Sequence, residues 1–227
     1  MTTPITEPAR EQAVYRPQAD TLLLLEALAH CRLTADDSVA DLCTGSGVIA
    51  RQAARNGAGI VVAVDDCPNS IAHAKRVNDR TGLSDHITTI CGDISTLPAR
   101  PTFNLVTCNP PYVPTPPNAD PALHPPGPSH SWDAGPDGRL VLDAVCSIGP
   151  RLLRPGGAML IVQSEFADVA ATSRQLIAAG MAVRIVTQAR IPFGPVLIAR
   201  AKWLEAQELL EHGCRTELLV VIEATAP

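Results

Sequence analysis

SVADLCTGSGVIA (residues 38–50) runs from a short apolar segment through two glycines into a segment with helical spacing. We predict a buried strand over 38–42, then a glycine turn, then a helix that Ser46 caps. Gly45 and Gly47 would let a ligand approach the backbone closely, and the free N–H groups at the helix start would face that ligand. The G-x-G-x-x-A pattern alone does not identify the ligand, because it also fits a nicotinamide dinucleotide.

Strand-like and helix-like segments alternate along the rest of the chain. The predicted strands are 38–42, 59–65, 86–93, 103–109, 158–164, 181–188 and 217–224. A first helix is predicted to begin at Asp20 or Thr21, one of which caps it. The other predicted helices are 46–57, 69–82, 138–148, 166–179 and 199–213. This alternation predicts an α/β fold with a Rossmann-like, mostly parallel seven-stranded sheet and helices on both faces. The last two strands are expected to depart from the parallel order. Pro150 is expected to break its helix.

Length and composition limit the classes of protein that fit. The chain has 227 residues, of which 46% are hydrophobic and 18% charged, and its net charge is −5. We assign 1–17 to an N-terminal arm and 18–227 to a single domain. The acidic balance argues against a nucleic-acid partner, and no apolar stretch reaches the ~18–20 residues that a membrane span needs. We expect a cytoplasmic protein without membrane contact.

The cysteines and histidines predict no metal site. The seven cysteines are widely spaced, and they form neither a C-x-x-C pair nor a cluster with the six histidines. Structural metal sites need such closely spaced ligands. Small buried thiols are therefore the expected state of these cysteines.

Acidic residues end three of the predicted strands and Asn109 ends the next. Asp41, Asp65 and Asp93 would meet Asn109 at one edge of the sheet, because parallel sheets bind ligands beyond the carboxyl ends of their strands. Asp65 follows Gly45 by 20 residues and suits the two hydroxyls of a ribose. Asp41 would repel a pyrophosphate but suits a cationic amino-acid group, and Asp93 would accept from the amine of an adenine. Together the three acids indicate S-adenosylmethionine rather than a dinucleotide.

Asn109-Pro110-Pro111-Tyr112 opens a loop, 109–137, that holds ten of the 21 prolines of the chain. The proline rings lock φ near −65°, so the direction of the Pro110 carbonyl is fixed before any acceptor binds. The Asn109 side-chain oxygen and this carbonyl would grip both hydrogens of an NH2 group and orient its conjugated nitrogen. Tyr112 offers a flat face for a planar amide or base. The motif therefore predicts methylation of a planar amino group.

With these features together, the sequence resembles the class I SAM-dependent methyltransferases of the HemK/PrmC family, which modify the glutamine of a Gly-Gly-Gln motif in polypeptide release factors. Two further segments strengthen the resemblance. Segment 14–28 resembles the entry segment of the shorter, HemK2/Mtq2-like branch, and segment 131–143 resembles the Gly-x-Asp-Gly stretch of the family. The segments that carry the resemblance are DLCTGSGVIA (41–50), AVDDCPNSI (63–71), CGDI (91–94), FNLVTCNPPYVP (103–114), VYRPQADTLLLLEAL (14–28) and SWDAGPDGRLVLD (131–143). The resemblance to the family extends over roughly residues 14–225.

The resemblance implies roles for individual residues. Asn109, Pro110 and Tyr112 are the expected catalytic clamp on the acceptor amide. The expected cofactor-binding residues are Tyr15, Thr21, Asp41, Gly45, Gly47, Asp65, Asp66, Asp93, Ile94 and Asn109. Tyr15 and Thr21 are expected to close over the cofactor.

The chain also departs from the longer branch of the family. Only about 37 residues precede the first strand, too few for the N-terminal helical domain that grips the release factor in that branch. Recognition of the substrate is therefore expected from the proline loop or from a partner. The shorter branch often works with a small zinc-binding activator of the Trm112 type, so an activator subunit is an expected partner. Segment 195–213 is expected to form an added amphipathic helix that packs on the domain.

Three acceptors remain open at this stage. The favoured acceptor is a glutamine amide of a protein such as a release factor. A small molecule of a specialised pathway and the amino group of adenine in DNA or RNA are the alternatives, because the same clamp fits a planar adenine amine. The acidic balance and the lack of a target-recognition domain argue against nucleic acid. A scaffold without enzymatic activity would not need an intact clamp.

Overall fold

A computed structural model describes residues 16–97, 100–116, 123 and 129–227. Within these ranges seven strands form one sheet in the order β3-β2-β1-β4-β5-β7-β6. The strands are β1 (Ser38–Leu42), β2 (Ile60–Asp65), β3 (Ile87–Cys91), β4 (Phe103–Cys108), β5 (Leu153–Ser164), β6 (Ala182–Pro192) and β7 (Thr216–Thr225). The predicted α/β class and the seven-stranded, mostly parallel sheet are confirmed.

The order of the strands reverses between β1 and β4, which is where open α/β sheets bind ligands. These two strands are parallel neighbours, and Leu42 stands opposite Cys108 in their register. The glycine turn that follows Leu42 and the Asn-Pro-Pro-Tyr motif that follows Cys108 therefore leave the sheet side by side. By contrast, β7 runs antiparallel to both β5 and β6, so the predicted departure from the parallel order is confirmed for β7 and wrong for β6, which runs in the same direction as β5.

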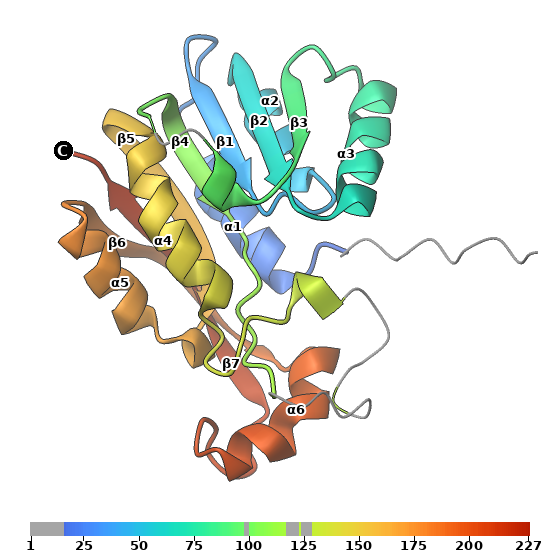
Figure 1. Cartoon of the computed structure of the whole chain (residues 1–227), viewed down its shortest axis with the longest axis vertical. Helices are drawn as coiled ribbons and strands as arrows, with labels where there is room; N and C mark the ends of the chain where they lie inside the picture. The colour runs from blue at the N-terminus through green and yellow to red at the C-terminus, as the bar shows by residue number, and fades with distance from the viewer. Residues whose placement is uncertain (1–15, 98–99, 117–122, 124–128) are drawn as a thin grey trace, which may run out of the picture.

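Helices cover both faces of the sheet. They are α1 (Ala19–Ala29), α2 (Val48–Arg55), α3 (Pro68–Thr81), α4 (Leu140–Leu152), α5 (Val169–Ala178) and α6 (Pro195–Ala206). In Figure 1, α4 and α5 pack together on the face toward the viewer, while α1 and α2 pack together on the opposite face. No helix within the described ranges is long and apolar enough to cross a membrane.

Three predictions at helix ends are wrong. Asp20 and Thr21 do not cap α1, because the helix begins at Ala19 and both side chains are buried and bonded to Asn109 instead. Ser46 does not cap α2; Gly47 stands at the N-cap with φ 76°, so the backbone turn itself starts the helix. Pro150 does not break α4. It lies in the last turn of the helix, where only the bond to the carbonyl one turn earlier is lost.

The proline loop is bonded to α6 through Arg200, whose side chain is fully buried. Its guanidinium donates to the Pro114 carbonyl at 3.0 Å and the Leu123 carbonyl at 3.3 Å, and forms an ion pair with Asp133. The helix predicted over 195–213 ends at Ala206; its predicted packing is confirmed for Leu197, Ala201 and Leu204, which are buried, but not for Leu209, which is exposed. Arg200 thus connects the described parts of the loop to the segment inserted before β7.

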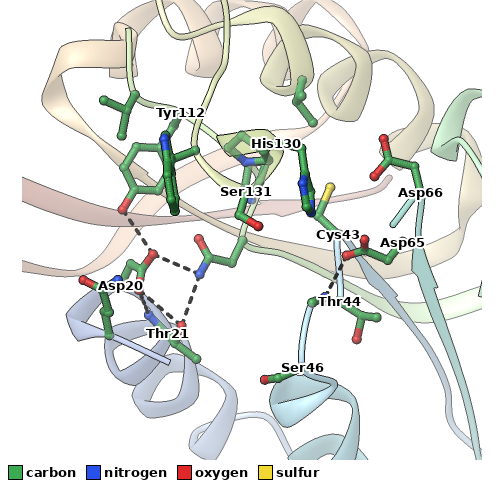
Figure 2. Close-up of a pocket in the computed structure, with 18 of the residues that line it drawn as sticks. Asp20, Thr21, Cys43, Thr44, Ser46, Asp65, Asp66, Tyr112, His130 and Ser131 are labelled. Carbon is green, nitrogen blue, oxygen red and sulfur yellow. Dashed lines mark hydrogen bonds between the residues drawn. The ribbon is translucent and has the colours of Figure 1, made fainter. Parts of the chain in front are cut away.

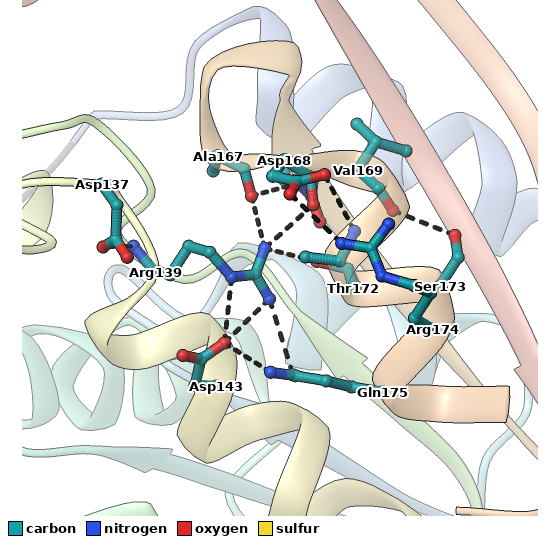
Figure 3. Close-up of polar contacts among 12 residues, drawn as sticks. Asp137, Arg139, Asp143, Ala167, Asp168, Val169, Thr172, Ser173, Arg174 and Gln175 are labelled. Atoms are coloured by element: carbon teal, nitrogen blue, oxygen red, sulfur yellow. Dashed lines mark hydrogen bonds and ion pairs between the residues drawn. The ribbon is translucent and has the colours of Figure 1, made fainter. Parts of the chain in front are cut away.

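A second buried arginine connects the start of α4 to α5 (Figure 3). Arg139 pairs with Asp143 at 2.8 Å and donates to the Ala167 carbonyl and, at 3.1 Å, to Thr172 Oγ1. Because a guanidinium holds its donors in a rigid fork, these bonds fix how α4 enters the fold. The Gly-Pro-Asp-Gly stretch before Arg139 is therefore anchored on its C-terminal side.

Candidate active site

The glycine turn after β1 is held against the end of β2. The Gly45 N–H donates to Asp65 Oδ2 at 2.8 Å (Figure 2), and the Thr44 N–H donates to the Val64 carbonyl at 2.9 Å. Gly45 has φ 54°, and a β-carbon there would meet nothing within 4 Å. The turn therefore presents bare backbone to an open space, as close approach of a ligand requires.

Asp41 lies under this turn and is almost fully buried. Its carboxylate accepts hydrogen bonds from Thr44 Oγ1 at 2.5 Å, the Ala50 N–H at 3.1 Å and Thr107 Oγ1 at 2.7 Å. Burial raises the pKa of Asp41 to about 6, against these bonds, which lower it. Asp41 thus holds the turn and the start of α2 to β4. Its predicted contact with the cationic group of the cofactor stays a prediction.

The acids after β2 and β3 differ in their surroundings. Asp65 is buried, and its second oxygen accepts from the Cys67 N–H at 2.9 Å; burial raises its pKa. Asp66 and Asp93 are exposed, and the hydrogen bond from the Ser95 N–H lowers the pKa of Asp93. Ile94 beside them is buried. A fixed carboxylate with spare lone pairs next to open glycine backbone fits the ribose of S-adenosylmethionine.

The Asn-Pro-Pro-Tyr motif is oriented by the start of α1. Asn109 Nδ2 donates to Asp20 Oδ2 at 3.1 Å and to Thr21 Oγ1 at 3.3 Å, and the Tyr112 hydroxyl donates to the same Asp20 oxygen at 3.2 Å (Figure 2). An ionised carboxylate only accepts, so the Asn109 amide must turn its NH2 group toward Asp20. Its Oδ1 then faces away from Asp20 and keeps its capacity to accept hydrogen bonds.

Gly138 supports the motif from behind. It has φ 73°, and a β-carbon there would overlap the Tyr112 carbonyl oxygen and approach Pro114 Cδ to 3.2 Å. Only glycine allows the backbone of the Gly-Pro-Asp-Gly stretch to lie so close to the chain after Tyr112. The similarity of this stretch to the family therefore has a physical reason.

One cavity of about 550 Å³ joins the glycine turn to the motif, a usual size for a small-molecule site. Every predicted site residue within the described ranges lines it except Gly47, which packs at the start of α2. Tyr15 lies outside the described residues. The predicted residues that line the cavity are Thr21, Asp41, Gly45, Asp65, Asp66, Asp93, Ile94, Asn109, Pro110 and Tyr112.

The sequence did not identify several other residues that line the cavity. These are Asp20, His130, Ser131, Trp132, Val196, Leu197 and Glu217. Asp20 is predicted to be a helix cap, and the others lie in the proline loop, in α6 or at the start of β7, where no pattern indicates an orientation. Figure 2 shows His130 and Ser131 facing the same cavity as Cys43 and Asp65. The returning end of the proline loop therefore forms one wall of the site.

Comparisons with known proteins agree with this geometry. A family model described as a methyltransferase domain matches residues 39–124. A Methanocaldococcus jannaschii protein named as a candidate protein N5-glutamine methyltransferase is 29% identical over 83% of this chain and 91% of its own length. The release factor glutamine methyltransferase of Mycolicibacterium smegmatis is 32% identical over 67% of this chain, which spans 54% of that relative.

Solved structures show the same fold at lower identity. The YcgJ protein of Bacillus subtilis superposes with a TM-score of 0.63 at 14% identity, over 90% of this chain and 98% of that one. The Mtq2 structure from E. cuniculi superposes with a TM-score of 0.58 at 20% identity, over 94% and 99% of the two chains. The chain therefore has the class I methyltransferase fold, and its sequence is similar to the HemK/PrmC release factor glutamine methyltransferases.

Proposed function

We propose that the chain methylates the side-chain amide nitrogen of a glutamine in a protein of the release-factor type. The observation that carries this function is the bond from Asn109 Nδ2 to Asp20, because it leaves Asn109 Oδ1 available as an acceptor in a cavity that Pro110 and the glycine turn also line. The relatives named for glutamine methylation point to the same acceptor. The whole activity remains a proposal because the chain spans only part of the release factor enzymes.

One half of the cavity is assigned to the cofactor. Asp65 would accept from the ribose hydroxyls, since two backbone N–H groups already hold its carboxylate in place. Asp93 and Ile94 would line the adenine, while Gly45 would allow close approach. Asp41, Asp66 and Thr21 are assigned to the same half because they line this cavity. When bound, S-adenosylmethionine supplies a methyl group that its sulfonium makes easy to transfer.

The other half is assigned to the acceptor. Asn109 Oδ1 and the Pro110 carbonyl would each accept one hydrogen of the amide NH2 and orient the nitrogen toward the cofactor half. Tyr112, buried and fixed through its hydroxyl, would stack on the planar amide. No residue needs to remove a proton beforehand, because the methylated nitrogen releases its proton to water. Preorganised acceptors of this kind supply rate through position rather than through acid–base chemistry.

The partners follow from the same proposal. The E. cuniculi relative in fold was solved as an Mtq2–Trm112 complex described as responsible for methylating the termination factor eRF1. A small activator subunit is therefore a proposed partner of this chain, alongside the protein substrate. Methyl transfer by the purified chain with and without an added Trm112-type protein tests the partner; equal rates would remove it.

The acceptor is tested with labelled S-adenosylmethionine. The purified chain is incubated with an unmodified release factor, and the digested product is analysed by mass spectrometry. One added methyl group on the glutamine of the Gly-Gly-Gln motif is the expected result. In a parallel incubation with cell lysate, label found in nucleic acid or in the small-molecule fraction instead of protein would contradict the proposal.

A further inference from the structure

Glu217 is a buried acid in the cavity that the proposed clamp does not use. It stands near the start of β7, is 5% exposed, and lines the cavity that holds Asn109 and Tyr112. Its Oε2 atom has no hydrogen-bond partner among the described residues. Because a buried polar atom without a partner is costly, such an atom in a binding cavity indicates a missing ligand group.

The surroundings of Glu217 place it in the acceptor half. Burial, together with the carboxylates of Asp20 and Glu165, raises the pKa of Glu217 to about 7, while a hydrogen bond from Ser164 lowers it. Asp20 is the carboxylate that holds Asn109 and Tyr112. Glu165 is occupied elsewhere, with the Leu218 N–H at 2.8 Å and Arg190 at 3.2 Å. No described cation is paired with Glu217, so its carboxyl is left for the acceptor.

The number of hydrogen-bond acceptors limits what that ligand group can be. Asn109 Oδ1 and the Pro110 carbonyl already match both hydrogens of an NH2 group, so a third acceptor needs a further N–H or O–H donor. An adenine base in DNA has no further N–H, since its ring nitrogens only accept. A peptide has one N–H in almost every residue. Trp132, which also lines this cavity, has a buried Nε1 without a hydrogen-bond partner among the described residues, and it offers the donor that a peptide carbonyl needs.

We propose that Glu217 Oε2 binds a main-chain N–H of the peptide that carries the methylated glutamine, which makes Glu217 a specificity-determining residue for peptide over adenine. The inference rests on the proposed function. At pH 8, above the raised pKa of about 7, the ionised Glu217 carboxylate is the form that accepts from an incoming N–H. A charge-assisted hydrogen bond of this kind corresponds to about a 10- to 100-fold change in binding.

The test compares wild type with Glu217→Ala and Glu217→Gln at pH 8. The acceptors are a Gly-Gly-Gln peptide and a set of analogues, each with one backbone nitrogen methylated so that one N–H is lost. Wild type should lose at least about 10-fold in kcat/KM with one analogue. Glu217→Ala should show a correspondingly higher KM for the parent peptide and no further loss with that analogue. Glu217→Gln, which keeps a neutral acceptor, should fall between the two.

Glu223→Gln is the matched control, because Glu223 lies on the same strand and pairs with Arg184 instead of lining the cavity. Calorimetry with S-adenosylmethionine checks that each variant is folded and binds the cofactor as wild type does. An unchanged KM for the parent peptide in Glu217→Ala would overturn the role of Glu217. So would an equal loss of kcat/KM with each analogue in wild type and in Glu217→Ala. If wild type methylates neither the peptide nor a whole release factor, the proposed function itself fails and the inference with it.

Discussion

Asp20 Oδ2 accepts hydrogen bonds from both Asn109 Nδ2, at 3.1 Å, and the Tyr112 hydroxyl, at 3.2 Å. A single carboxylate at the start of α1 thus fixes both side chains of the proposed clamp. Asp20 is buried, and its other oxygen accepts from the Thr21 N–H at 2.6 Å. Helix α1, which forms no part of the central strand–turn–helix unit, therefore sets the orientation of the Asn109 amide.

Asp20→Asn is expected to lower kcat about 10- to 100-fold, because an asparagine at this position can donate and no longer requires Asn109 to turn its NH2 group inward. Cofactor affinity should stay close to that of wild type. Steady-state methyl-transfer kinetics and calorimetry measure the two effects. A loss of cofactor binding equal to the loss of rate would show instead that Asp20 serves only to keep α1 in place.

Asp65→Ala is expected to weaken S-adenosylmethionine binding well beyond tenfold. It removes the proposed ribose acceptor and also the partner of the Gly45 N–H. Titration calorimetry measures the affinity, with Asp85→Ala as a control at an exposed position. An Asp65→Ala protein with wild-type affinity would contradict the assignment of the cofactor half.

Gly138→Ala is expected to lower methyl transfer strongly, because the added carbon would displace the backbone behind Tyr112. Gly156→Ala is a closely matched control: both glycines have φ 73°, but a β-carbon at Gly156 meets nothing within 4 Å. Both variants carry the same backbone strain, so the difference in kcat between them isolates the steric contact. Equal kcat values would show that Gly138 does not support the clamp.

Asp41 predicts a pH dependence of stability. The folded-state pKa is about 6 and the unfolded chain keeps the ordinary value of 3.8, so the unfolded state ionises first as the pH rises. Relative to Asp41→Asn, wild type should lose roughly 3 kcal/mol of unfolding free energy in all between about pH 3 and pH 7, roughly 2 kcal/mol of it between pH 4 and pH 6. Urea denaturation of both proteins across this range measures the difference. A constant difference would mean that Asp41 titrates normally.

The sequence predicted the parts of the site that the topology of the sheet brings together. Asp65, Asp93 and Asn109 follow strands whose carboxyl ends must meet at one edge, so their shared cavity follows from alternation alone. Asp20 was assigned to the wrong role, because an acid at a helix start is usually a cap and only the tertiary contact with Asn109 shows otherwise. Glu217 gave no signal, since one acid near the start of an apolar strand fits a solvated end equally well.

In the fold, too, the strands were easier to predict than the features that depend on tertiary contacts. Buried strands such as β1 and β2 were predicted from their apolar runs because both of their faces lie in the core. The helix ends were predicted less well. Pro150 lies inside α4 because packing of the last turn outweighs one missing hydrogen bond, and α2 begins on Gly47 because the turn before it is held by Asp41.

The measurement that tests the central claim most directly is methyl transfer by Asn109→Ala, with cofactor affinity determined on the same protein. Loss of the Asn109 oxygen should reduce kcat for the glutamine amide by roughly 100- to 1,000-fold, as loss of one preorganised group does in other enzymes, while S-adenosylmethionine still binds. Undiminished turnover by Asn109→Ala would contradict the account.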